Sequence, residues 1–424
     1  MGDINILDIF QGVATLVDSA GSEPKIFFGR IVLIFIGFLL IYLGKKGILE
    51  ALIMVPMGIG MAAINAAVMF VPPKLVAPGS LIPEGGFGKG TLFINPLVSE
   101  GTQWVEMLQI QWLQPVYTFM FSNGLIACLV FLGIGSLLDV GFVMARPFKS
   151  MFIALCAELG TFVAFPLAVL MGLPLADAAA TATIGGADGP MILFAALMLS
   201  ENLFVPITVV AYLYLGLTYG GYPFMIKAMV PRRIRGMKMP EEHTHPITPD
   251  EKIVFAVAAA TALCLLFPVA SPLFLALFTG VIVREAGLNH YHEVFSGPIL
   301  YGSTFFLGLL LGVLCEASTI LKPEVLILLI IGIIALAFSG FGGLLGGYVL
   351  YFATGKKYNP VIGIAGVSCV PTTAKVAQKT VSEVNPNSII MQHALGASIS
   401  GVITSAIFAA VLITVVRASG AGAL

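Results

Sequence analysis

Charged residues are scarce in this sequence: only 10% of the 424 residues are Asp, Glu, Lys or Arg, whereas 58% are hydrophobic. The mean hydropathy is +1.01. A soluble domain carries about 25% charged residues, so this composition excludes a water-soluble globular protein and predicts an integral membrane protein. The formal net charge is −1, and the positive residues are confined to a few short loops. We therefore expect no basic surface for nucleic acid.

Cysteine is also sparse. The five cysteines lie singly in apolar segments, without C-x-x-C or Cys/His metal spacing, and there a thiol behaves as a small hydrophobic group. We expect neither a disulfide nor a zinc site. Residues 1–25 lack the basic start of a cleaved signal peptide, so insertion is expected to depend on the first spanning helix.

Apolar runs long enough to cross a bilayer as a helix, about 17 to 25 residues each, recur along the chain. They predict an all-α polytopic membrane protein. We expect ten transmembrane helices, at 26–44, 50–71, 117–144, 150–173, 204–229, 252–267, 272–284, 298–317, 324–353 and 388–416. Two further apolar stretches, 175–200 and 359–380, are interrupted by Gly, Pro and polar residues.

The loop charges predict the topology, because short cytoplasmic loops carry the excess of Lys and Arg. The basic loops are Lys45/Lys46, Arg146/Lys149, Arg232/Arg233/Arg235/Lys238, Arg284 and Lys356/Lys357. With all of these inside, the stretch 175–200 begins and ends outside, whereas 359–380 begins and ends inside. Both termini fall outside. The two stretches are therefore predicted to be re-entrant hairpins that enter from opposite faces.

Opposed hairpins of this kind are typical of inverted-topology repeats, so we predict an inverted 5+5 repeat. The motifs GGADGP at 185–190 and GVSCVP at 366–371 share the pattern G-x-x-x-x-P, although such short matches also arise by chance in a Gly/Ala-rich membrane chain. The predicted organisation is an external segment 1–25, a first repeat 26–230 containing an external insert 72–116, a cytoplasmic linker 231–251 and a second repeat 252–418.

Asp188 is the clearest candidate for function, because an ionisable group at membrane depth costs at least about 2.5–3.5 kcal/mol. Gly185, Gly186 and Gly189 allow the backbone to unwind around it, and Pro190 removes a donor, which frees carbonyl oxygens. A carboxylate beside free carbonyls suits Na⁺ or H⁺. The alternative is a carboxylate that a neighbouring hydroxyl satisfies in a packing role.

The second hairpin offers neutral oxygens and one positive charge. Neutral oxygen ligands can come from Asn359, Ser368, Thr372 and Thr373, but Ser and Thr in membrane helices often bond only to the preceding turn. Lys375 can attract an anion if buried, or extend to the cytoplasmic surface. Tyr214 lies near the middle of a predicted span, as does Tyr212, and there a phenol needs a partner or a role in proton transfer.

Other polar residues have milder explanations. The last span carries a polar stripe that includes Ser398, Ser400 and Ser405. Asp139 and Glu316 end paired spans just before Arg-Pro and Lys-Pro turns, and we expect solvation at the helix ends to satisfy them.

Four segments in this order, GGADGP, AYLY, NPVIGIAGVSCVPTTAK and HALGASISG, resemble the membrane β subunit of the biotin-dependent, sodium-transporting carboxyacid decarboxylases, which act on oxaloacetate, methylmalonyl-CoA or glutaconyl-CoA. The likeness covers almost the whole chain from residue 26, apart from the insert 72–116. It implies a subunit that decarboxylates carboxybiotin delivered by a partner and couples this step to outward Na⁺ movement and consumption of a proton.

The resemblance also implies roles for individual residues. It implies Na⁺ binding at Asp188, Gly186, Ser368 and Ser398. It implies that Tyr214 serves the coupled proton or carboxybiotin. It implies that Asn359 and Lys375 act on carboxybiotin, with Gly363 in the same half-site.

Two positions depart from the oxaloacetate members, which have Arg where this chain has Lys375 and Asn where it has Ser398. An ammonium is a point charge, whereas a guanidinium is a bidentate fork. These departures resemble the acyl-CoA branch.

The resemblance further implies a biotin carrier subunit, a carboxyltransferase α subunit, a small single-span membrane subunit, a homo-oligomer of the membrane subunit, and contact with lipid in the bacterial cytoplasmic membrane. Na⁺ and carboxybiotin are then the cofactors, the biotin being attached to the partner. As a hypothesis, a core carrying the hairpins slides against a scaffold in an elevator-like step. The competing class is a secondary Na⁺/solute transporter, because inverted repeats are equally compatible with it. A third interpretation is a purely structural membrane anchor, for which the intramembrane polar residues would be dispensable.

Overall fold

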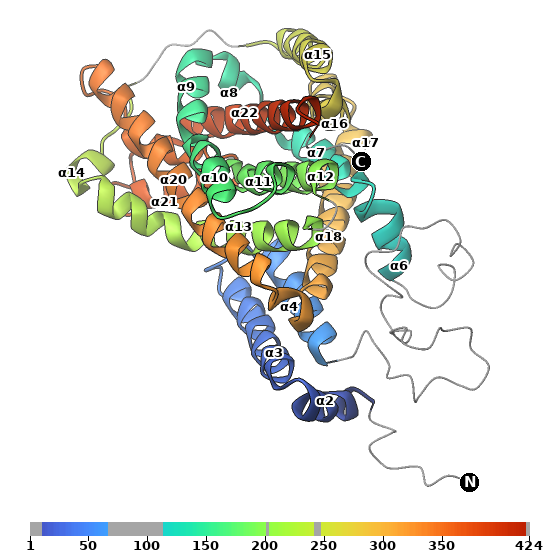
Figure 1. The fold of residues 1–424 in the computed structure, drawn as a ribbon. Coiled ribbons are helices and arrows are strands. Elements are labelled where there is room, and N and C mark those ends of the chain that lie inside the picture. The colour runs from blue at the N-terminus through green and yellow to red at the C-terminus, as the bar shows by residue number, and fades with distance from the viewer. Residues whose placement is uncertain (1–10, 67–112, 201–202, 241–246, 421–424) are drawn as a thin grey trace, which may run out of the picture. The chain divides into compact units, whose positions relative to one another are not determined.

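The structure, a computed structural model, describes residues 11–66, 113–200, 203–240 and 247–420, and within these ranges it is helical, without a β-strand. The predicted all-α class is confirmed for this part of the chain (Figure 1). In chain order the elements, with η for 3-10 and π helices, are α2 (Gln11–Ser22), α3 (Pro24–Lys45), α4 (Ala51–Ala66), α6 (Leu113–Val116), η3 (Tyr117–Phe121), α7 (Leu125–Leu137), α8 (Gly141–Met144), α9 (Pro147–Ala157), α10 (Leu159–Leu170), α11 (Leu175–Ala182), η4 (Thr183–Gly186), α12 (Gly189–Leu199), α13 (Phe204–Met229), α14 (Arg232–Arg235), α15 (Pro249–Leu266), η5 (Pro268–Ala270), α16 (Ser271–Glu285), α17 (Asn289–Val294), η6 (Phe295–Ile299), α18 (Leu300–Leu314), α19 (Ala317–Ile320), α20 (Pro323–Ala353), η7 (Pro360–Gly366), α21 (Thr372–Ser382) and α22 (Met391–Ala418).

Six described helical segments are long and apolar enough to cross a membrane, or seven if the bent helix α13 is one span. They are Pro24–Lys45, Pro147–Leu170, Pro268–Glu285, Asn289–Leu314, Pro323–Ala353 and Met391–Ala418. The protein is therefore a multi-pass membrane protein, but the predicted ten spans are not confirmed in the described ranges. The predicted span 117–144 is broken between η3, α7 and α8, and residues 67–71 of the predicted span 50–71 lie outside the described residues. The predicted insert 72–116 lies outside the described residues except for 113–116.

The chain forms two compact units. The first contains residues Met1–Leu125 and Thr304–Leu326, and the second contains Ile126–Ser303 and Ile327–Leu424. The predicted inverted repeats, 26–230 and 252–418, divide the chain differently and remain a prediction.

In the first unit, glycines let α3 and α4 approach closely. A Cβ placed on Gly37 would lie 2.6 Å from the carbonyl oxygen of Gly58, and one on Gly58 would lie 2.5 Å from that of Gly37. This is the small-residue packing that membrane helices use. Nearby, Arg30 is buried and its Nε donates to the carbonyl of Asn65 at 3.0 Å.

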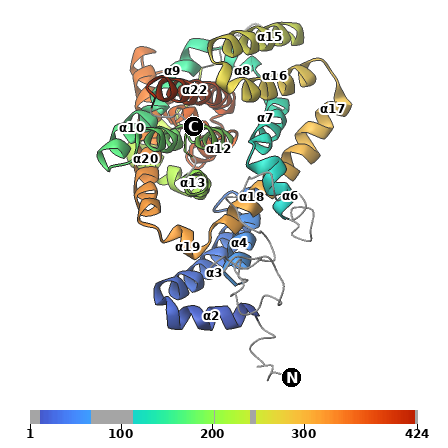
Figure 2. The ribbon, with the colours of Figure 1, turned by 45° about the vertical axis from the view of Figure 1, so that its right-hand side comes forward.

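The second unit is built around α22, whose small and polar residues are mostly buried. It packs against α9, α12, α21 and η7, and both ribbon views show it running beside α9 and α12 (Figures 1 and 2). A Cβ on Gly401 would lie 2.4 Å from the carbonyl oxygen of Gly366, so the last helix lies directly on the second predicted hairpin.

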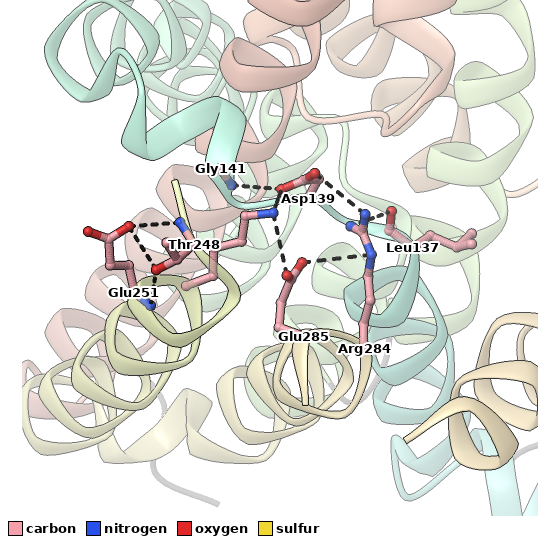
Figure 3. A network of polar contacts seen from close by, with 8 residues as sticks. Leu137, Asp139, Gly141, Thr248, Glu251, Arg284 and Glu285 are labelled. Atoms are coloured by element: carbon pink, nitrogen blue, oxygen red, sulfur yellow. Dashed lines mark hydrogen bonds and ion pairs between the residues drawn. The ribbon is translucent and has the colours of Figure 1, made fainter. Parts of the chain in front are cut away.

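Helix α15 begins at a capping box that the sequence displays as Thr248-Pro-Asp-Glu251. The Thr248 N–H donates to Glu251 Oε2 at 2.8 Å, and the Glu251 N–H donates to Thr248 Oγ1 at 3.3 Å (Figure 3). These reciprocal bonds satisfy donors that the first turn leaves open, and they fix the end of the predicted linker.

An ionic network joins the loop after α7 to the start of α15 and the end of α16 (Figure 3). Lys252 Nζ lies 2.7 Å from Asp139 Oδ1 and 3.4 Å from Glu285 Oε2. Arg284 Nη2 lies 3.5 Å from Asp139 Oδ2, and the Gly141 N–H donates to Asp139 Oδ1 at 2.9 Å. Partial burial raises the pKa of Asp139, but Lys252, the Gly141 N–H and Arg284 together lower it by more, so the pKa lies below its ordinary value. The expectation that solvent alone satisfies Asp139 is wrong.

Candidate functional site

The first predicted hairpin is a helix, a tight turn and a second helix. Helix α11 tightens into η4, Ala187 adopts a left-handed conformation with φ of 56°, and Asp188 starts α12. Ser200 Oγ donates to Asp177 Oδ1 at 2.5 Å, so the segment ends beside the place where it began. The stretch 175–200 therefore folds back on itself around the Gly-Gly-Ala-Asp-Gly-Pro motif.

The turn of this hairpin is seated on the start of α10. A Cβ placed on Gly185 would lie 2.2 Å from the Thr161 nitrogen, a separation that no side chain tolerates. Ser339 Oγ, from α20, donates to the Gly185 carbonyl oxygen. Glycine is thus required at this position because backbone touches backbone.

The second predicted hairpin also consists of two helical arms with a non-helical tip. Its first arm is η7, its tip runs through Ser368 to Pro371, and α21 is its second arm. Asn359 caps η7 by accepting the Val361 N–H at 3.1 Å. Thr373 Oγ1 donates to the Val367 carbonyl oxygen at 2.8 Å and holds the tip against the start of α21.

Residues 231–239 of the predicted linker, here called the strap, cross both ends of this second hairpin. Asn359 Nδ2 donates to the carbonyl oxygens of Arg235 at 3.1 Å and Met237 at 2.9 Å. At the other end, Asn385 Nδ2 donates to the Gly236 carbonyl at 2.9 Å, and Ser388 Oγ donates to that of Met237 at 2.8 Å. Both ends of the hairpin are therefore at the strap, so this segment also returns to where it began.

The two hairpin turns meet. Ser368 Oγ donates to the Gly186 carbonyl oxygen at 2.5 Å and lies 3.2 Å from Ser405 Oγ of α22. Ser405 Oγ in turn donates to Asp188 Oδ2 at 3.4 Å. A backbone carbonyl, two hydroxyls and a carboxylate thus form one continuous cluster of oxygens, and it includes three of the four residues predicted to bind Na⁺: Asp188, Gly186 and Ser368.

Asp188 is buried, with 5% of its surface exposed. Its Oδ1 accepts the Met191 N–H at 3.4 Å as the N-cap of α12, and among the described residues no Lys, Arg or His forms an ion pair with it. Capping alone is a structural role, but a buried carboxylate needs a compensating charge or a proton. The arrangement therefore requires a bound cation or a proton at Asp188.

The two mid-span tyrosines differ in environment. The hydroxyl of Tyr214 donates to the Leu329 carbonyl oxygen at 2.8 Å, away from the oxygen cluster. Tyr212 is 1% exposed, and a Cβ on Gly189 would lie 2.7 Å from its hydroxyl oxygen. That hydroxyl has no hydrogen-bond partner among the described residues. The structure thus places Tyr212, not Tyr214, beside the Asp188 turn.

The remaining predicted site residues lie elsewhere on the second hairpin or next to it. Gly363 is packed against the backbone of Gly343 in α20, which is a packing role. Ser398 is buried, and its hydroxyl oxygen lies 3.5 Å from Thr373 Oγ1 at the start of α21. Lys375 is exposed on α21, which contradicts the idea that it is a buried charge.

Two residues of this site are absent from the predicted set. Ser405 was assigned only to the polar stripe of the last span. Glu158 is a buried carboxylate in the middle of the predicted span 150–173, and the same rule that singled out Asp188, an ionisable group at membrane depth, would have found it.

Comparisons with known proteins show the family of this chain. The family profile described as the Na⁺-transporting oxaloacetate decarboxylase beta subunit matches residues 29–416. The chain is similar to a carboxybiotin decarboxylase of Malonomonas rubra, 50% identical over 409 residues that cover 96% of this chain and 98% of the relative. It is 30% identical to a methylmalonyl-CoA decarboxylase subunit beta of Veillonella parvula over 91% of this chain and 92% of the relative. It is 32% identical to an oxaloacetate decarboxylase beta chain 2 of Salmonella typhi, over 71% of each chain.

Proposed function

Because the chain belongs to the family of the Na⁺-transporting oxaloacetate decarboxylase beta subunits, we propose that it decarboxylates carboxybiotin and couples this reaction to outward Na⁺ transport and consumption of a proton. The chain is the carboxybiotin decarboxylase subunit of a sodium-transporting decarboxylase. The observation that carries the proposal is the contact between the two hairpin turns at a buried carboxylate for which the described residues supply no basic partner.

Na⁺ is bound at the oxygen cluster. Asp188 supplies the negative charge, and the Gly186 carbonyl, Ser368 and Ser405 supply neutral oxygens. Hard monovalent and divalent cations prefer such ligands, and interrupted helices are where transporters place them. Ser398, which the resemblance assigned to Na⁺, contacts Thr373 instead, so we assign its role to Ser405.

Carboxybiotin is bound at the start of α21, the second arm of the second hairpin. Lys375 is exposed on α21, where it can pair with the carboxylate of a biotin group carried by a partner. In the reaction the bond between the ureido nitrogen and the carboxylate carbon breaks, CO₂ leaves, and the electron pair stays on nitrogen, which takes up a proton. Tyr212, whose hydroxyl lies by the Asp188 turn, is better placed than Tyr214 to sense the cation.

The beta-subunit family implies partner subunits, and we propose that these are a biotin carrier, a carboxyltransferase α subunit and a small single-span membrane subunit. The membrane subunit is expected to form a homo-oligomer in the bacterial cytoplasmic membrane. An elevator-like movement of the hairpins remains a hypothesis.

The upstream acid is set by the partner carboxyltransferase. Lys375 and Ser398 predicted the acyl-CoA branch, but the chain is about equally similar to a methylmalonyl-CoA and an oxaloacetate member. The acyl-CoA branch therefore stays a prediction. To test it, the purified complex is assayed for decarboxylation of methylmalonyl-CoA, glutaconyl-CoA and oxaloacetate.

The decisive experiment compares the complex with its Asp188→Asn variant. The wild-type complex should contain a biotinylated subunit, should release CO₂ from carboxybiotin faster with added Na⁺, and should move ²²Na⁺ in proteoliposomes. Asp188→Asn should lose the response to Na⁺, whereas Asp177→Asn, a carboxylate at the base of the same hairpin, should keep it. Full Na⁺-dependent turnover in Asp188→Asn would refute the site. Na⁺-coupled solute uptake without a biotinylated partner would favour a secondary transporter.

A further inference from the structure

A second buried carboxylate faces the oxygen cluster. Glu158 is 2% exposed and lies at the junction of α9 and α10, within the spanning segment Pro147–Leu170. Thr161 Oγ1 donates to Glu158 Oε2 at 2.7 Å. No Lys, Arg or His forms an ion pair with Glu158 in the described part of the chain. A carboxylate so placed within an apolar span is costly unless a cation or a proton accompanies it.

Glu158 points at the unwound turn of the first hairpin. A Cβ placed on Gly186 would lie 3.6 Å and 3.7 Å from its two carboxylate oxygens, and 3.0 Å from Ser405 Cβ. The absence of a side chain at Gly186 therefore leaves the Glu158 carboxylate directly against the residue whose carbonyl belongs to the cluster. Gly185, packed on Thr161, fixes the turn relative to the start of α10.

Tyr212 gives a second, independent indication of a ligand at this turn. It contacts Gly189, on the C-terminal side of Asp188, and its buried hydroxyl has no partner among the described residues. Buried hydroxyls nearly always make a hydrogen bond. Within the described ranges this hydroxyl has no partner although it lies at the turn that carries Asp188, which indicates that the turn holds something other than protein.

We propose that Glu158 is a second carboxylate ligand of the cation bound at the Asp188 turn. This inference rests on the proposed Na⁺ site. The site then has two negative charges, the Gly186 carbonyl and the hydroxyls of Ser368 and Ser405, so it is hard and strongly anionic. Cation affinity rises with the number of charged ligands, so Glu158 sets how much Na⁺ the enzyme needs.

The test uses the whole purified complex and two measurements. The first is the Na⁺ concentration for half-maximal CO₂ release from carboxybiotin. The second is the rise in melting temperature when choline chloride is replaced by NaCl at equal ionic strength, which reports binding to the folded state without turnover. Both are compared for wild type, Glu158→Gln, Glu158→Asp and the matched control Glu324→Gln, an exposed glutamate at the start of α20.

Glu158→Gln should raise the half-saturating Na⁺ concentration by about tenfold or more and reduce the thermal stabilisation by NaCl, while kcat at saturating Na⁺ changes less. Glu158→Asp should restore part of the affinity, and Glu324→Gln should match wild type. If Glu158→Gln does not assemble, Thr161→Val, which removes the hydroxyl bonded to the carboxylate, should raise the Na⁺ requirement in the same direction. Wild-type Na⁺ dependence and stabilisation in Glu158→Gln would overturn the proposal.

The measurements distinguish a site that lacks the Glu158 ligand from a protein that has no sodium site. If wild type depends on Na⁺ and Asp188→Asn does not respond, but Glu158→Gln behaves as wild type, only the role of Glu158 is lost. If wild type itself shows neither Na⁺-stimulated turnover nor stabilisation by NaCl, the sodium site as a whole is refuted.

Discussion

Replacing Asn359 by Asp should loosen the strap while leaving the helix cap in place. The amide of Asn359 makes three contacts: its oxygen accepts the Val361 N–H at 3.1 Å, and its nitrogen donates to the carbonyls of Arg235 and Met237 at 3.1 and 2.9 Å. An aspartate has the same shape and can still accept from Val361, but it has no N–H to donate. The change therefore removes the two bonds to the strap and sets a buried carboxylate oxygen against the Arg235 and Met237 carbonyls.

The expected magnitude follows from these two bonds. Each net hydrogen bond contributes about 0.5–1.5 kcal/mol, so the strap should be destabilised by about 1–3 kcal/mol. This corresponds to about a 5- to 150-fold increase in its opened population. The Met237 carbonyl keeps the Ser388 hydroxyl at 2.8 Å, but the buried carboxylate adds its own cost, so this range is a lower bound.

Limited trypsin digestion of the detergent-purified complex measures this opening. The strap contains Arg232, Arg233, Arg235 and Lys238, and the Nε and Nη1 atoms of Arg235 are buried, so cleavage after Arg235 requires local opening. When closing is faster than cleavage, the rate follows the opened population.

Two asparagines serve as references for the digestion. Asn385→Asp removes one donor to the strap, at Gly236, and should have a smaller effect than Asn359→Asp. Asn123→Asp, an exposed turn asparagine outside the strap, should have none. Cleavage of Asn359→Asp at the wild-type rate would refute the assignment of the strap contacts.

Two further predictions concern other parts of the second unit. Gly185→Ala should lower the melting temperature of the complex and abolish Na⁺-stimulated turnover. The reason is that a Cβ would lie 2.2 Å from the Thr161 nitrogen, and overpacking costs about 1–3 kcal/mol or more. The control Gly221→Ala, at a position with open space around it, should change neither the melting temperature nor the turnover. The pKa of Asp139 is lower in the folded protein than in the unfolded chain. The ion pair between Asp139 and Lys252 therefore stabilises the fold at pH values above the ordinary aspartate pKa. This stabilisation is lost as the pH falls through the lower, folded-state pKa. Asp139→Asn should reduce stability at pH 7 by about 1 kcal/mol and flatten the fall in melting temperature on acidification; an unchanged profile would contradict this.

Hydropathy and local signals predicted much of the helical framework. The last predicted span, 388–416, corresponds to α22 at Met391–Ala418, and 252–267 corresponds to α15 at Pro249–Leu266. The start of α15 is visible in the sequence as a capping box. The clusters of Gly and Pro located the breaks in both hairpins, because these residues end helices for local reasons. Span counts were less predictable, since several helices bend or stop within an apolar run.

The oxygen cluster was predictable only in part. Asp188, Gly186 and Ser368 carry local signals of charge, glycine and hydroxyl in an apolar setting. That Ser368 bonds Gly186, 182 positions away, depends on tertiary packing that no local pattern encodes. The choice between Tyr212 and Tyr214 was also hidden, because residues two apart on a helix point about 200° apart and the sequence does not say which face meets the turn.

The second hairpin connects the two halves of the proposed chemistry. Its base is bonded to the strap through Asn359, and its tip, Ser368, is bonded to the Gly186 carbonyl beside Asp188. A carboxylate bound at Lys375 of α21 and a cation bound at the tip would thus act on one hairpin. Coupling needs such an element, whose position both ligands bias. Asn359→Asp should therefore change the Na⁺ concentration for half-maximal turnover as well as the trypsin rate. Faster cleavage with an unchanged Na⁺ dependence would show that the strap and the cation turn act independently.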